Sequence, residues 1–229
     1  DISWVDILSL ITLSILLKPI LNWFCKSSPT CFTRRLDKWS ISSNLPIYIF
    51  TPFFGSAIVG KYSLALMIVL TPLSIIINSN AKVYNQKLAE LYNKKENVYV
   101  FTLNLIKSLL KKITLPFTIF IIFTPQIFEI IFGTQWIDSG KYIQILSFYI
   151  FLNLIVSIIA YIPNLLNLQR KALKIAIIHF ILLSILLYFT SKYFDIYISL
   201  ASMTILNSLV LIYNFIWMTT ALKDRKWGY

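Results

Sequence analysis

The chain has 229 residues, of which 58% are hydrophobic and only 13% are charged, and its formal net charge is +12. A soluble domain carries about 45–50% apolar and about 25% charged residues. The composition therefore excludes a disordered tail, a disulfide-rich scaffold and an ordinary cytosolic enzyme. Together with a mean hydropathy of +0.75, it indicates a polytopic membrane protein.

Seven apolar segments are long enough to cross a membrane as helices, which takes about 20 residues each. Strands of a lipid-facing barrel are shorter, at about 10 residues, and alternate in polarity. Because a backbone in lipid must satisfy its own hydrogen bonds, we expect an all-α bundle of about seven transmembrane helices. The segments cover residues 3–24, 39–59, 61–81, 113–133, 142–163, 172–190 and 196–222.

Residues 82–112 separate the third and fourth segments and have a mixed character. Apolar residues recur there near helical spacing, and lysines occupy the positions between them. This pattern is typical of an amphipathic helix at a membrane surface. We expect a helical hairpin that rests in the headgroup zone.

Basic residues gather in every second connection between the segments. Seventeen lie on one side of the expected membrane and three on the other, with Lys18 inside the first segment. Cytoplasmic loops collect lysine and arginine, so we expect a plasma-membrane protein of the bacterial inner membrane, with its N-terminus outside and its C-terminus cytoplasmic. Charges that alternate with apolar segments contact membrane lipids, and we expect no nucleic-acid partner.

The sequence contains no recognisable catalytic or metal-binding motif. A structural zinc site needs about four nitrogen or sulfur ligands, and Cys25, Cys31 and the distant His179 cannot supply them. We expect no catalytic residue, no metal and no cofactor, and a protein that is not an enzyme. His179 lies within an apolar segment and is expected to be a neutral hydrogen-bonding residue, with a proton relay as the alternative.

Prolines and polar side chains in the second and third segments favour a polar cavity. Proline frees backbone groups, which in a membrane need polar surroundings. Tyr48 and Asn78 are the candidate cavity residues from these segments, and Lys18 and Lys61 are the candidate cations. Lys18 has an alternative in reaching the cytoplasmic face. Lys61, at an expected tight turn beside Gly60, either guards the outer mouth or only ends a helix.

Two stretches carry a resemblance to a known family. The first, residues 45–91, contains motif positions in a fixed order: Leu45, Pro46, Phe53, Phe54, Gly55, Val59, Gly60, Tyr62, Leu64, Ala65 and Pro72. The second, residues 130–146, contains Phe132, Gly133, Trp136, Gly140 and Tyr142. In these motifs the chain resembles the Wzx-type O-antigen flippases, polysaccharide biosynthesis proteins of the MOP exporter superfamily.

The resemblance implies two helical lobes around a central cavity. Residues 1–25 would be the last helix of a missing N-terminal lobe, residues 39–222 a six-helix C-terminal lobe, and residues 223–229 a cytoplasmic tail. The implied substrate is a polyprenyl-pyrophosphate-linked oligosaccharide, an O-antigen or capsular repeat unit, moved across the plasma membrane by alternating access. The implied partners are this lipid-linked oligosaccharide, membrane lipids, and the missing lobe or a second subunit.

One position departs from the family pattern. Many members carry an arginine in the cavity where this chain has Met67. A pyrophosphate needs cationic partners, so Lys18, Lys61 or the missing lobe would supply the charge, unless this chain handles its substrate differently. Two other functions stay open: a membrane-embedded glycan polymerase or acyltransferase, and a non-transporting membrane scaffold or transporter remnant.

Overall fold

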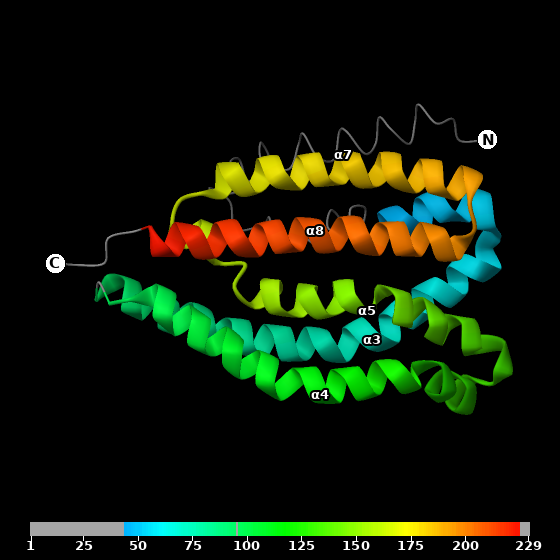
Figure 1. The fold of residues 1–229 in the computed structure, drawn as a ribbon, viewed down its shortest axis with the longest axis horizontal. Coiled ribbons are helices and arrows are strands. Elements are labelled where there is room, and N and C mark those ends of the chain that lie inside the picture. The colour runs from blue at the N-terminus through cyan, green and yellow to red at the C-terminus, as the bar shows by residue number, and fades with distance from the viewer. Residues whose placement is uncertain (1–43, 95, 225–229) are drawn as a thin grey trace, which may run out of the picture.

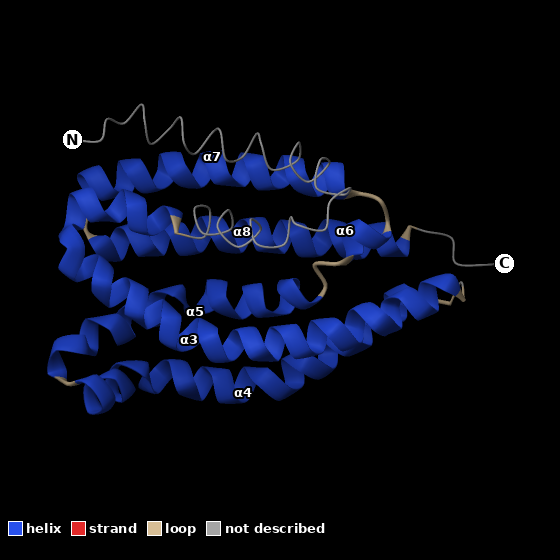
Figure 2. Cartoon of the chain, turned by 180° about the vertical axis from the view of Figure 1, so that it is seen from behind, coloured by secondary structure: helices blue, strands red, loops and turns tan. Residues whose placement is uncertain are grey.

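The computed structural model describes residues 44–94 and 96–224, and every regular element in this part of the chain is helical (Figure 2). Five helical segments are long and apolar enough to cross a membrane. This confirms the expected all-α, polytopic class. The elements are α3 (Leu45–Asn93), α4 (Val98–Phe132), the 3₁₀ helix η3 (Thr134–Trp136), α5 (Ile137–Ile158), the short α6 (Ile162–Leu165), α7 (Gln169–Tyr193) and α8 (Ile196–Lys223).

The long helices run roughly side by side, and α5 is the central one (Figure 1). It contacts α3, α4 and α8, while α7 packs on α8 and α3. Buried apolar side chains form one cluster toward each end of the bundle, and α3, α4, α5 and α8 contribute to both. The described residues therefore form one connected helical lobe.

The number of spans differs from the expectation of seven. Residues 45–59 and 61–81 of the second and third expected segments belong to a single element, α3, and the segment at residues 3–24, with Lys18, lies outside the described residues. The expected turn at Gly60 and Lys61 is wrong, because both residues are helical. Hydropathy measures the length of an apolar stretch but does not locate a break within it.

The break in α3 lies at Gly55, whose φ of 80° and ψ of 163° are not helical. Glycine adopts a positive φ without steric cost, and Pro52 weakens the preceding turn because it has no backbone N–H. The Phe50 and Tyr62 rings pack edge to face with centroids 5.7 Å apart. In a straight helix these residues would be about 18 Å apart, so the chain turns back at Gly55.

Residues 82–112 are largely helical, as expected, but they are the continuous ends of α3 and α4. The two ends pair in antiparallel fashion and extend past α5 (Figure 1). Tyr84 Oη and Thr102 Oγ1 are 2.9 Å apart in the buried interface. Asn97 caps the N-terminus of α4, because its Oδ1 accepts a hydrogen bond from the Val100 N–H at 3.2 Å.

Candidate functional site

A row of side chains on α3 points out of the lobe. Met67, Thr71, Ser74 and Asn78 are spaced by four, three and four residues, which places them on one helix face. All four are exposed, and Met67 is 72% exposed. We call this row, in which Thr71, Ser74 and Asn78 are polar, the α3 polar stripe. It lies in a helix whose apolar window has a mean hydropathy of 1.8.

The polar groups of the stripe differ in their bonding. The Thr71 hydroxyl donates to the Met67 carbonyl at 2.6 Å, and the Ser74 hydroxyl donates to the Thr71 carbonyl at 2.7 Å. Both hydroxyl oxygens keep a lone pair that can accept a hydrogen bond from a ligand. The Asn78 amide has no hydrogen bond to any residue that the structure describes, so it offers both a donor and an acceptor.

Lys61 lies in an ion pair at the opposite end of the lobe from the paired tips of α3 and α4. Its Nζ is 3.1 Å from Asp138 Oδ2, and both side chains are partly exposed. Lys141 Nζ lies 3.3 Å from Asp138 Oδ1, to which Tyr197 also donates a hydrogen bond at 3.4 Å. The Ser139 hydroxyl donates to the Lys61 carbonyl at 3.1 Å. Asp138 thus joins α3, α5 and α8.

Asp138 was not singled out from the sequence, and this connection was missed. The two partners are 77 positions apart, so no local spacing could reveal it. The Asp138 carboxylate, shared by Lys61 and Lys141, offsets part of the positive charge that made Lys61 a candidate for binding an anion.

The sequence-predicted cavity residues are not gathered at one point. Lys61 and Asn78 are separated by 17 helical residues, which is about 25 Å along α3 and about 100° around its axis. Tyr48 is exposed on the short arm before Gly55, and Lys18 lies outside the described residues. These residues remain predictions, and a ligand that touched Lys61 and Asn78 would have to travel along the helix.

His179 forms a hydrogen bond between two helices, which confirms its expected bonding. Its Nε2 on α7 is 2.8 Å from Asn207 Oδ1 on α8. Asn207 is only 4% exposed. The contact lies within the apolar part of both helices and holds them together. Within the described residues, no group of three or more His, Cys, Asp or Glu side chains could hold a metal ion.

The comparison with protein families decides what kind of protein this is. A family model described as "polysaccharide biosynthesis protein" matches residues 17–141. The chain belongs to the polysaccharide biosynthesis protein family. The comparisons with curated proteins and with solved structures found no match.

The matched range of this polysaccharide biosynthesis protein covers α3, α4, η3 and the first turn of α5. It therefore includes the α3 polar stripe and both partners of the Lys61–Asp138 pair. The apolar helices long enough to span a membrane and the family match together indicate a membrane protein that takes part in polysaccharide biosynthesis.

Proposed function

We propose that this protein is a transporter, and not an enzyme, that moves a polyprenyl-pyrophosphate-linked oligosaccharide across the bacterial plasma membrane by alternating access. Family membership supports a role in polysaccharide biosynthesis. The finer proposal rests on the α3 polar stripe. In the stripe, the exposed amide of Asn78 has no hydrogen bond within the described part of the chain, on a helix long and apolar enough to span a membrane.

A polar amide that faces hydrocarbon is unfavourable, because lipid offers it no hydrogen-bond partner. The stripe is therefore better placed against a polar cavity than against lipid. A second helical lobe would form the other wall of that cavity, supplied either by further sequence or by a second subunit.

The stripe suits a sugar chain that must pass without being held tightly. Sugar hydroxyls can donate to the oxygens of Thr71 and Ser74, and Asn78 can both donate and accept. Net hydrogen bonds of this kind contribute about 1 kcal/mol each, so each contact is easily exchanged for the next. A row of weak contacts along a helix lets a sugar chain move along it and does not hold the chain in one place.

The pyrophosphate needs a cation that is not already paired. Lys82 follows Asn78 by one helical turn and is exposed, which places it at the lysine-rich end of the stripe. Lys61 is bonded to Asp138, so we assign it to closing the opposite end of the path. In this scheme the lysine-rich helix ends and the C-terminus are cytoplasmic and the N-terminus of the chain is outside.

The test measures lipid-linked oligosaccharide in a host strain that lacks this protein. Without it, the lipid-linked unit should accumulate in the inner leaflet, protected from a label added outside. We expect Asn78→Leu to lower the rescue of transport by about fivefold, the equivalent of one hydrogen bond of about 1 kcal/mol to the moving sugar. Ser79→Leu is the matched control, because Ser79 is exposed on α3 and bonds back to the Ile75 carbonyl, about 100° away from the stripe.

Two outcomes would contradict the proposal. Glycan units that reach the outer leaflet normally but stay unpolymerised would identify a polymerase. An unchanged distribution of lipid-linked units in the deletion strain would leave the protein as a scaffold.

A further inference from the structure

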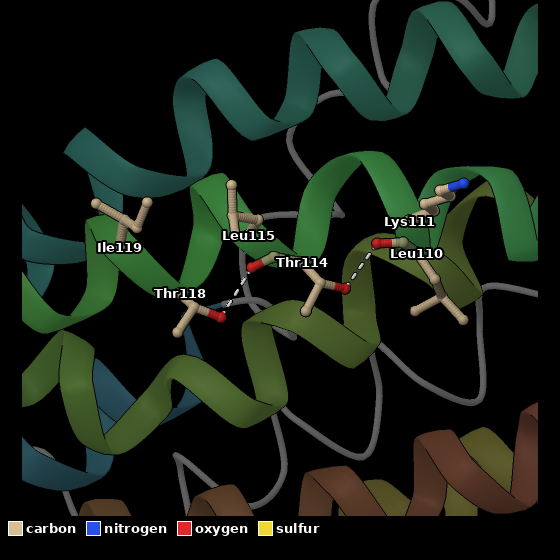
Figure 3. Close-up of a pocket in the computed structure, with 6 residues that line it drawn as sticks. All are labelled: Leu110, Lys111, Thr114, Leu115, Thr118 and Ile119. Atoms are coloured by element: carbon tan, nitrogen blue, oxygen red, sulfur yellow. Dashed lines mark hydrogen bonds between the residues drawn. The ribbon is translucent and has the colours of Figure 1, made fainter.

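A shallow depression on the outer surface of α4 stands apart from the α3 polar stripe. Its volume is about 530 Å³, and it is open to the surroundings along much of its length. Figure 3 shows the residues that line it, all of them from α4: Leu110, Lys111, Thr114, Leu115, Thr118 and Ile119.

Three exposed lysines of α4 lie at or beside one end of the depression. Lys107, Lys111 and Lys112 are exposed, and none forms an ion pair with a residue in the described part of the chain. Two other lysines of the same helix pair behave differently, because Lys87 and Lys94 both bind the Glu90 carboxylate, at 2.9 and 2.7 Å. Positive charge is therefore left uncompensated at the depression.

The rest of the depression is apolar in character. Leu115 is 71% exposed, and Ile119 is half exposed one turn further along. The Thr114 hydroxyl donates to the Leu110 carbonyl at 2.7 Å, and the Thr118 hydroxyl donates to the Thr114 carbonyl at 2.8 Å. Since both hydroxyl hydrogens are used within the helix, neither threonine has a donor to offer a ligand, and their methyl groups add to the apolar surface.

The length of this surface matches one leaflet of a membrane. From Lys111 to the exposed Ile122 the helix rises about 16 Å, and half of a bilayer core is about 15 Å. With Lys111 at headgroup level, the apolar face that follows it on α4 would therefore be about as long as an acyl chain.

We propose that this depression binds one anionic phospholipid. Its phosphate lies between Lys107 and Lys111, which are one turn apart, and one acyl chain runs along Leu115, Ile119 and Ile122. Charge complementarity with these lysines favours an acidic headgroup, and the apolar face favours a lipid over a free phosphate. The site lies on α4 and does not depend on the transport function proposed above.

The test titrates the purified full chain in detergent with phosphatidylglycerol or phosphatidylcholine and counts bound lipids by native mass spectrometry. We expect the first phosphatidylglycerol to bind about tenfold more tightly than phosphatidylcholine. The K107Q/K111Q variant should lose that preference, since a lysine near an anionic lipid surface contributes about 1 kcal/mol. The matched control is K87Q/K94Q, which removes the same charge from lysines already bonded to Glu90 and should keep the preference.

A second variant tests the apolar half of the site without changing any charge. Ile119→Trp fills the depression and should weaken the first phosphatidylglycerol about tenfold, while glycerol phosphate at millimolar concentration should not displace the lipid. Circular dichroism and gel filtration confirm that each variant is folded. Equal loss of preference in both lysine pairs would overturn the proposal, as would equal binding of the two lipids or unchanged binding to the Ile119→Trp variant.

Discussion

Gly140, in the first turn of α5, lies directly against the backbone of α4. A Cβ atom at this position would come within 2.5 Å of Pro125 Cα and 2.9 Å of the Thr124 carbonyl oxygen. Small residues let membrane helices approach to backbone contact. Gly140 and the neighbouring Ser139 therefore set the distance at which α5, the central helix, meets α4 and α3.

Replacing Gly140 by alanine should destabilise the lobe, because the clash is with backbone atoms that cannot rotate away. We expect a loss of about 1–3 kcal/mol in the free energy of unfolding. Gly60→Ala is the matched control, since Gly60 is helical and a Cβ there would meet nothing within 4 Å. That variant should be neutral or up to about 1 kcal/mol more stable. Thermal unfolding in detergent measures both, and equal melting temperatures for the two variants would contradict the packing argument.

At the scale of the helical elements, α7 and α8 are linked by the His179–Asn207 hydrogen bond. Most other side-chain hydrogen bonds of these helices run back to a carbonyl of the same helix, as Ser184 does to Phe180. A bond between helices stabilises their association, whereas a bond within a helix does not.

A double-mutant cycle should detect this difference. We expect His179→Leu and Asn207→Leu to be coupled by about 0.6 kcal/mol, with about 1.7 kcal/mol as the upper end for hydrogen bonds between membrane helices. Ser184→Ala combined with Asn207→Leu should be additive. Unfolding in mixed detergent gives the free energies, and additivity in the first cycle would show that the two side chains do not stabilise each other.

At the scale of the whole molecule, the two ends of the bundle differ in charge. The paired ends of α3 and α4, the start of α7 and the end of α8 lie together at one end (Figure 1) and carry most of the described lysines. The opposite end carries only three lysines among the described residues, Lys61, Lys141 and Lys192. Such an asymmetry orients a membrane protein with its basic end in the cytoplasm.

Single cysteines at the two ends should therefore be labelled from opposite sides. In a chain with Cys25 and Cys31 changed to serine, a maleimide that cannot cross membranes should label Gln135→Cys on intact cells and Ser108→Cys only after permeabilisation. Both positions are exposed, on η3 and α4 respectively. Labelling of Ser108→Cys on intact cells would reverse the proposed orientation.

The helical class and most of the helices could be predicted from the sequence, because long apolar runs leave the backbone few alternatives in lipid. The break in α3 was not located from the sequence, since both Gly55 and Gly60 permit a turn, and the packing of Phe50 on Tyr62 becomes visible only in the structure. Contacts between residues far apart in the sequence could not be predicted either. The Lys61–Asp138 pair joins positions 77 apart and leaves no local signal, whereas the pairs of Lys87 and Lys94 with Glu90 have the helical spacings of three and four residues that a sequence does reveal.

The break at Gly55 divides α3 into a short arm before it and a long arm after it. After Gly55, 38 residues continue to Asn93 with helical dihedral angles, a distance of about 57 Å. A rotation of about 10° at this glycine would swing the far tip by about 10 Å, on the rise per residue of an α-helix. Because this tip packs in one buried cluster with α4, α5, α6 and α8, a rotation at Gly55 would move those helices together with the tip, relative to the short arm before Gly55.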